Sequence, residues 1–238
     1  MAHLYGPAPD AALSERHARD GLAIFCAEAC EHGQAYAQHV LTQIKTAAGE
    51  LDEAEQFETH ALALFRKEGI KRDVAWSLAH LGDIALMRGR LEQARMYREE
   101  SLVMFQEIEE RNGVCVTLHA LAQIAREAGD LQLAQQRLIA GLHLADEWQR
   151  PYVLAHGLYE LAGVQLAMGC SAHAALLIGI ADALVLKQAL AYPPHEIARF
   201  DGWRNAMRDA MGEAAFATTV QLGARLRLEQ AVGMIAER

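Results

Sequence analysis

The sequence has 238 residues, of which 52% are hydrophobic but only 6% aromatic, so alanine, leucine, isoleucine and valine must supply most of any core. Lysine and arginine number 22 against 31 acidic residues, which gives a formal charge of −9. A surface that follows nucleic-acid phosphates carries the opposite balance, so direct nucleic-acid binding is not expected. Alanine and leucine lose least on entering a helix, and this composition favours an all-α protein.

Cysteine usage and apolar runs indicate a cytoplasmic protein. The four cysteines (Cys26, Cys30, Cys115 and Cys170) form no C-x-x-C pair, which is typical of reduced thiols in the cytosol. The N-terminal "MAHLYGPAPDAALSERH" lacks the basic and apolar segments of a signal peptide. The apolar run "AALLIGIADALVL" contains Asp182 and is shorter than the ~20 residues that a membrane span needs.

The first predicted helix is "LSERHARDGLAIFCAEACEHG". It places Leu22 and Phe25 in register with Leu62 and Phe65, 40 residues further on. We therefore expect the second helix of a hairpin whose first helix is missing. Apolar surface left around Leu22 and Phe25 would favour a homodimer through this half repeat.

Four rows of 40 residues follow from Ala35, and each divides at a glycine into two amphipathic stretches of about 15 residues. The columns that hold through all rows are Leu41, Leu81, Leu121 and Leu161; Ile44, Ile84, Ile124 and Val164; Gly49, Gly89, Gly129 and Gly169; and Ala54, Ala94, Ala134 and Ala174. Glycine ends a helix because it enters the left-handed conformation without a steric penalty, and a small alanine lets the next helix approach closely. Each row is thus predicted to be a helical hairpin that buries its apolar face against its neighbours.

After Pro193-Pro194 the 40-residue register is lost, and three further helices are expected, broken near Gly212 and Gly223. The predicted fold is an all-α, right-handed solenoid of antiparallel hairpins. Residues 1–192 form a half repeat and four hairpins, and residues 193–238 form capping helices of the same domain.

The motifs "HLGDIALMRG" and G-polar-L-x-x-A at each corner resemble tetratricopeptide (TPR) repeats, although the period is longer than the usual ~34 residues. The longer version is similar to the C-terminal repeat regions of bacterial LuxR-type regulators and signal-transduction ATPases, which include the maltose regulator. "GEAAF" at 212–216 and "LEQAV" at 228–232 carry this resemblance near the C-terminus. The sequence has no G-x-x-x-x-G-K-[ST] loop, so the resemblance implies a sensor or scaffold section without its ATPase and DNA-binding parts.

Residues on the inner face of the first helices are the candidate binding residues, because the TPR resemblance implies that this face lines a concave groove. They are Tyr36, His39, Gln43, Trp76, Asp83, His119, Gln123, Arg126, His156 and Tyr159. Aromatic rings beside hydrogen-bonding side chains suit recognition of a peptide or a small molecule. An alternative is that Tyr36 and Trp76 pack between hairpins while His39 and His119 are solvated without a ligand. The acidic runs "GELDEAEQFE" and "EIEER" are expected to be solvated outer faces.

No catalytic or metal chemistry is expected. The nearest approach to a metal cluster is Cys26, Cys30 and His32, and a zinc site would need further ligands from elsewhere. No nucleophile elbow or Cys-His grouping occurs, and no cofactor is predicted. The leading hypothesis is a non-enzymatic module that binds a protein or peptide segment in its groove. A small-effector sensor of a transcriptional regulator and a homodimerisation module are the alternatives.

Overall fold

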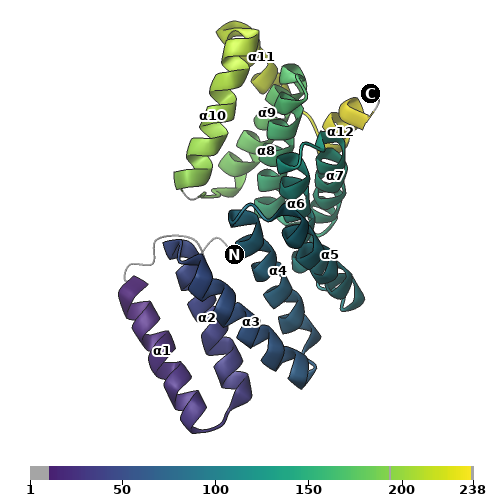
Figure 1. The fold of residues 1–238 in the computed structure, drawn as a ribbon. Coiled ribbons are helices and arrows are strands. Elements are labelled where there is room, and N and C mark those ends of the chain that lie inside the picture. Colours follow the sequence, from purple (N-terminus) through teal and green to yellow (C-terminus); the bar gives the residue numbers. More distant parts are fainter. Residues whose placement is uncertain (1–10, 193, 237–238) are drawn as a thin grey trace. The chain divides into compact units, whose positions relative to one another are not determined.

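The structure, a computed structural model, describes residues 11–192 and 194–236, and all regular elements within these ranges are helices (Figure 1). In chain order they are α1 (Ala11–Ala27), α2 (Glu31–Ala48), α3 (Leu51–Glu68), α4 (Lys71–Met87), α5 (Leu91–Glu107), α6 (Arg111–Glu127), α7 (Leu131–Glu147), α8 (Pro151–Ala167), α9 (Ser171–Gln188), α10 (Pro194–Met211), α11 (Glu213–Gly223) and α12 (Leu228–Ala236). The predicted all-α architecture of repeated hairpins is confirmed.

The corners inside the hairpins are built as the sequence predicts. Gly49, Gly89, Gly129 and Gly169 all have positive φ angles, between 70° and 84°. The corners between hairpins follow a second series at the same interval, Ala29, Gly69, Glu109, Gln149 and Ala189, and these residues are also left-handed. Sequence inspection missed this second series because only one of its members is glycine.

Pairs of helices pack closely at these corners, including α2 with α3, α4 with α5 and α8 with α9. The alanine column is fully buried at all four positions, and the leucine column is buried throughout. A side chain larger than alanine would separate each pair, so the repeated alanine sets the distance between the two helices of a hairpin.

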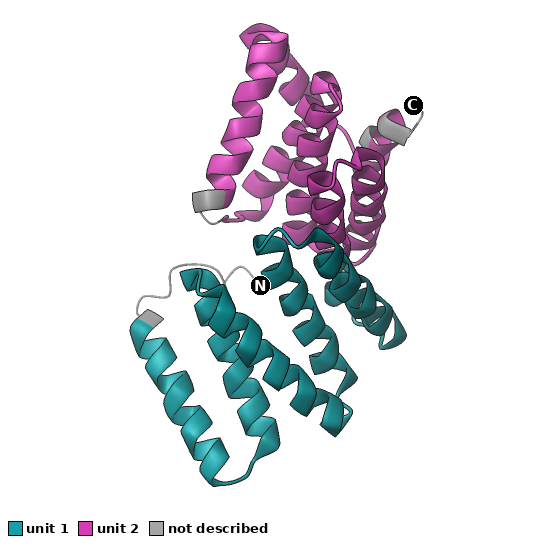
Figure 2. Cartoon of the chain, in the orientation of Figure 1, with its two compact units in different colours: residues 1–117 teal, residues 118–238 magenta. Residues whose placement is uncertain are grey.

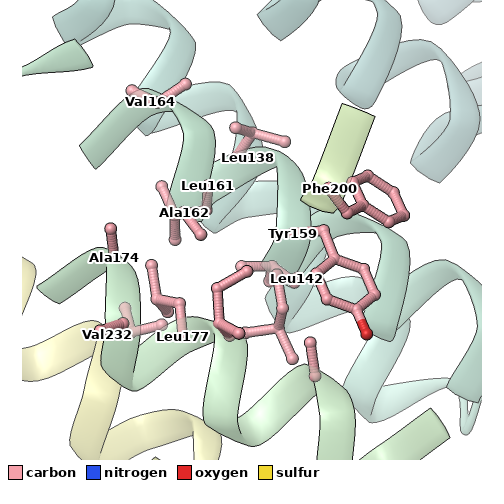
Figure 3. Close-up of a cluster of buried hydrophobic side chains, with 14 of the residues drawn as sticks. Leu138, Leu142, Tyr159, Leu161, Ala162, Val164, Ala174, Leu177, Phe200 and Val232 are labelled. Atoms are coloured by element: carbon pink, nitrogen blue, oxygen red, sulfur yellow. The ribbon is translucent and has the colours of Figure 1, made fainter. Parts of the chain in front are cut away.

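The chain divides into two compact units, residues 1–117 and 118–238 (Figure 2). The core of unit 1 gathers Leu62, Phe65, Leu78 and Leu81 among others. The core of unit 2 is larger and lies around α8 and α9; Figure 3 shows part of it. The division falls inside α6, so α10–α12 belong with α7–α9 to unit 2. The sequence-based boundary at residue 192 remains a prediction.

The three C-terminal helices form as predicted, and one ring contact of the repeats recurs on α10. The rings of His39 and His80 are 4.7 Å apart, and those of Tyr159 and Phe200, which are separated by the same sequence interval, are 4.2 Å apart. α10 therefore packs on α8 through a ring contact like that between α2 and α4. The 40-residue interval of the corners nevertheless ends here, because the next left-handed glycine after Gly169 is Gly212.

The N-terminal helix packs against the first hairpin, and the half repeat remains a prediction. α1 packs on α2, and the ring of Phe25 lies directly over Gly33, where a β-carbon would collide with it. Leu22 and Phe25 are consequently half-buried within unit 1. The large apolar side chains of α1 that face outward are Leu13 and Ile24.

Among the described helices, only α9 is long and apolar enough to cross a membrane by length and composition. One face of it is buried in unit 2, where α8, α10, α11 and α12 pack against it. Its acidic residue, Asp182, is held by Arg204 and by the hydroxyl of Tyr159. These contacts are those of a central core helix.

Candidate functional site

A hollow of about 230 Å³ lies between α2 and α4 in unit 1. We call it the α2–α4 hollow; its lining residues are Tyr36, His39, Gln43, Phe65, Arg72, Asp73, Trp76 and His80. The α2 residues recur at intervals of three and four, as do those of α4, so each set lies on one face of its helix.

One wall of the hollow is aromatic. The ring of Tyr36, which is 42% exposed, meets the buried ring of Phe65 edge-on at 5.3 Å. Trp76 packs in the same way against Phe105 of α5 at 4.8 Å. The Tyr36 hydroxyl donates a hydrogen bond of 2.8 Å to Asp73, which ties α2 to α4 at the rim. Rings fixed in this way offer contact area at a small cost in conformational entropy.

The floor of the hollow contains a buried charge pair. Nδ1 of His39 lies 3.0 Å from a carboxylate oxygen of Glu58, whose side chain is 0% exposed. Burial opposes the charged form of both groups, but their mutual hydrogen bond and attraction prevail, so the pKa of His39 is raised and the pKa of Glu58 is lowered. The amide of Gln43 lies 3.2 Å from the other ring nitrogen of His39.

His80 completes the floor, and its pKa is shifted in the opposite direction. Its ring lies beside that of His39, and burial together with the nearby positive charges lowers its pKa, against the pull of Glu58. The floor therefore holds two imidazoles with opposite pKa shifts: His39, whose two nitrogens contact Glu58 and Gln43, and His80, which has neither contact.

The structure brings together four of the residues predicted for unit 1: Tyr36, His39, Gln43 and Trp76. Asp83 lies on the same helix as Trp76 but does not line the hollow, because it forms an ion pair with the buried Arg98 of α5. The same register position is therefore a lining residue on α2 and a structural ion pair on α4.

The residues predicted in unit 2 do not form an open face. His119 is 9% exposed and packs against Gly141 and Gly157, so it is neither solvated nor available to a ligand. Tyr159 is 3% exposed because Phe200 and Arg204 of α10 cover it. For these two residues the expectation of a groove position is wrong.

The other predicted residues of unit 2 make contacts of their own. His156 lies 3.5 Å from Glu196 of α10. Gln123 donates a hydrogen bond to Glu127 on the same helix. Arg126 lies over the ring of Trp203, at 5.9 Å. His156 and Arg126 are thus met by side chains of α10 and act in packing, whereas Gln123 contacts only its own helix.

The place in unit 2 that corresponds to the α2–α4 hollow is filled. There Tyr159 and Phe200 stand where His39 and His80 stand in unit 1, and the two rings stack (Figure 3). Trp203 lies over Gly163, so that a β-carbon there would be 2.7 Å from the indole. The hollow is thus present between α2 and α4, and the equivalent place between α8 and α10 is occupied by side chains.

Comparison with known families agrees with this architecture. Residues 1–201 match the family described as the MalT-like TPR region. The chain belongs to this family. The match includes Phe200 of α10, which stacks on Tyr159 of α8. MalT-like and other TPR-like repeat families are generally non-catalytic scaffolds for protein interaction.

Solved structures with the same fold include three informative relatives of this MalT-like TPR chain. TPR-like repeats of a putative kinesin light chain from Podosopora anserina have 20% identity and a TM-score of 0.60, over 79% of this chain and 99% of that one. BtubC (BKLC) from P. vanneervenii has 15% identity and a TM-score of 0.67, over 96% and 89%. The apo form of RapI has 12% identity and a TM-score of 0.70, over 87% and 73%. No curated protein matches the sequence significantly.

Sequence analysis of this MalT-like TPR chain missed half of the hollow. His80 is four residues beyond Trp76, and a search at that helical spacing would have found it. Glu58 ends the run "GELDEAEQFE", which was expected to be solvated; it is instead fully buried, because it faces His39 across the hairpin. Arg72 and Asp73 begin α4 and carry no motif that points to a site.

The candidate metal ligands of the N-terminal region do not assemble. His32 pairs with Glu68 at 2.6 Å, and the thiols of Cys26 and Cys30 are exposed and free. In the described part of the chain, no three histidine, cysteine or acidic side chains form a group that could hold a metal ion.

Proposed function

We propose that this protein is a non-catalytic interaction module that binds a segment of a partner protein in the α2–α4 hollow, as part of a bacterial regulatory system. The observation that carries the proposal is the hollow itself, walled by fixed aromatic rings, where the corresponding position of unit 2 is filled by Phe200 and Trp203.

The size of the hollow favours a peptide side chain over a whole effector. Pockets that enclose drug-sized molecules usually measure about 300–1,000 Å³. At about 230 Å³ the hollow is smaller than this range. It suits one large side chain of a segment whose backbone runs along the outside, with the aromatic wall as the anchor point.

The chemistry of the lining favours binding over catalysis. None of the eight lining residues is serine, threonine, cysteine or lysine, and the lining tyrosine and carboxylate, Tyr36 and Asp73, are hydrogen-bonded to each other.

An effector sensor is the second candidate, and the family match favours it. A MalT-like TPR region over residues 1–201 is consistent with a sensor section of a LuxR-type regulator. In that case a small molecule, rather than a peptide, would occupy the hollow. The net charge of −9 supports neither direct nucleic-acid contact nor binding to an anionic membrane.

Localisation and assembly belong to the same proposal. We place the protein in the cytoplasm, since its four thiols are free, as is usual in a reducing compartment.

A homodimer through α1 would use the outward-facing Ile24. Light scattering during size-exclusion chromatography tests it: a monomer at high concentration contradicts the dimer and leaves the peptide site unaffected.

The binding proposal can be tested with a phage-displayed library of random 12-residue peptides, selected on the full chain. We expect enriched peptides that bind the wild type and lose binding to Trp76→Ala. Trp148→Ala is the matched control, because Trp148 follows α7 in unit 2 and does not line the hollow. If nothing is enriched, or if enriched peptides bind the Trp76→Ala protein equally well, the hollow is not the peptide site.

A further inference from the structure

The hydrogen-bonding groups around the α2–α4 hollow are unequally satisfied. Tyr36 donates to Asp73, and His39 contacts Glu58 and Gln43. By contrast Arg72, Trp76 and His80 line the hollow and have no hydrogen bond or ion pair to any residue that the structure describes.

Arg72 is unusual among its neighbours. Every other lysine and arginine on α2–α5 has an acidic partner within this fully described part of the chain; for instance Arg66 pairs with Glu100, and Lys71 pairs with Glu107. Lys71 and Arg72 share the first turn of α4, yet Lys71 is directed to α5 and Arg72 to the hollow. The unpaired guanidinium is thus confined to the edge of the candidate site.

The unsatisfied groups are mainly donors. A guanidinium offers five N–H donors and an indole offers one, and neither accepts a hydrogen bond; a neutral imidazole offers one donor and one acceptor. A ligand that complements this set must therefore be rich in acceptors. A carboxylate has only acceptors, and its planar pair of oxygens matches the fork of an arginine.

The acidic groups near the hollow do not cancel this preference. Asp73 receives the hydroxyl of Tyr36, Glu58 is paired with His39, and Glu68 is paired with His32 at 2.6 Å. Each of these carboxylates has a donor on one oxygen; the second oxygen of Glu58 is buried and has no hydrogen-bond partner. The net charge of −9 acts from farther away, and physiological salt screens exposed charges beyond ~8 Å.

We propose that the bound partner segment carries an aspartate or glutamate whose carboxylate pairs with Arg72, beside an aromatic or large aliphatic side chain that fills the hollow between Tyr36 and Trp76. This inference rests on the proposed function and specifies its ligand: an acidic-aromatic peptide. His80 and the indole N–H of Trp76 supply further donors to the same carboxylate or to the adjoining peptide carbonyls.

The peptides enriched from the random 12-residue library provide the test. We expect an acidic residue within two positions of an aromatic or leucine residue in most of the enriched sequences. For the best peptide, labelled with fluorescein, fluorescence anisotropy should show a loss of about three- to fivefold in affinity on Arg72→Gln, the size expected for an exposed ion pair. Lys71→Gln, which removes a cation from the same helical turn, should leave the affinity unchanged.

The outcomes separate the two proposals. Peptides that need Trp76 but lack an acidic residue, or that bind Arg72→Gln as tightly as the wild type, would overturn the acidic-aromatic assignment and leave peptide binding at the hollow intact. Sodium 3-phenylpropionate, a free aromatic carboxylic acid, serves as the second arm. If it binds more tightly than the peptides, the carboxylate belongs to a small molecule and the peptide assignment is overturned.

Discussion

Nδ1 of His39 on α2 lies 3.0 Å from the carboxylate of Glu58 on α3, and this carboxylate has no exposed surface. The pair joins the two helices of the first hairpin beneath the hollow. A buried carboxylate is costly unless it is paired, so the position of the imidazole is tied to the hairpin itself. The floor of the candidate site is therefore as rigid as the repeat that carries it.

Replacing Glu58 with glutamine should lower the pKa of His39. Without the carboxylate, burial is the main remaining influence, and burial disfavours the charged imidazole. An NMR titration of the histidine ring protons measures this change. Glu92→Gln removes an exposed carboxylate on α5 and is the control. An unchanged His39 pKa in Glu58→Gln would show that the pair does not form in solution.

The same pair gives a defined pH window of stability. The pKa of Glu58 is below its ordinary 4.5, so its contribution is present above pH 4.5 and is lost as the pH falls through the lowered value. The pKa of His39 is above its ordinary 6.5, so its contribution is present below pH 6.5 and is lost as the pH rises through the raised value. Urea denaturation should therefore show the largest difference between wild type and Glu58→Gln between pH 4.5 and 6.5. A difference independent of pH would contradict the ion pair.

His119 should make unit 2 sensitive to acid. Burial lowers the pKa of this imidazole from 6.5 to about 3. Between these two values the imidazole is protonated in the unfolded chain but neutral in the folded chain. Stability then falls as the pH drops through this window. We expect His119→Gln to move the acid-unfolding midpoint, followed by circular dichroism, to a lower pH. His143→Gln, at an exposed histidine of α7, should leave the midpoint where it is.

Gly179 should be intolerant of any side chain. A β-carbon there would collide with the backbone carbonyl of Val220, because α9 and α11 touch backbone to backbone. Overpacking of this kind costs about 1–3 kcal/mol, so Gly179→Ala should lower the urea midpoint. Gly202→Ala is the matched control: nothing lies within 4 Å of that position on α10, and helix propensity should stabilise the variant by up to ~1 kcal/mol. Equal effects of the two replacements would contradict the contact.

Phe200 should be the anchor of α10. Its buried ring stacks on Tyr159 at 4.2 Å, and truncation of a buried phenylalanine costs about 3–5 kcal/mol. We expect Phe200→Ala to expose α10 to limited proteolysis and to lower the unfolding midpoint. Ile197→Ala, on the exposed side of the same helix, should change stability by less than about 0.5 kcal/mol. Proteolysis of both variants at the same rate would show that the ring does not hold the helix.

The candidate site was only partly predictable from the sequence. The helical spacing of Tyr36, His39 and Gln43 on one face follows from geometry, and the structure places all three in the hollow. Glu58 could not be assigned in this way, because an acidic residue in an acidic run is usually solvated and only the opposing helix shows that it is buried. The same periodicity placed Tyr159 on an open face, and α10 covers it.

The sequence by itself determined the repeating unit: glycine at each hairpin corner and alanine where the paired helices touch depend on local backbone conformation and on side-chain size, which are properties of single positions. Only the tertiary structure decided which inner-face position stays open. Whether such a position stays open depends on the side chain that the following helix places over it. Phe200 covers Tyr159, whereas His80 lies beside His39 and leaves the hollow open. Packing against a distant segment is a property of pairs of positions, and the spacing within one helix carries no information about it.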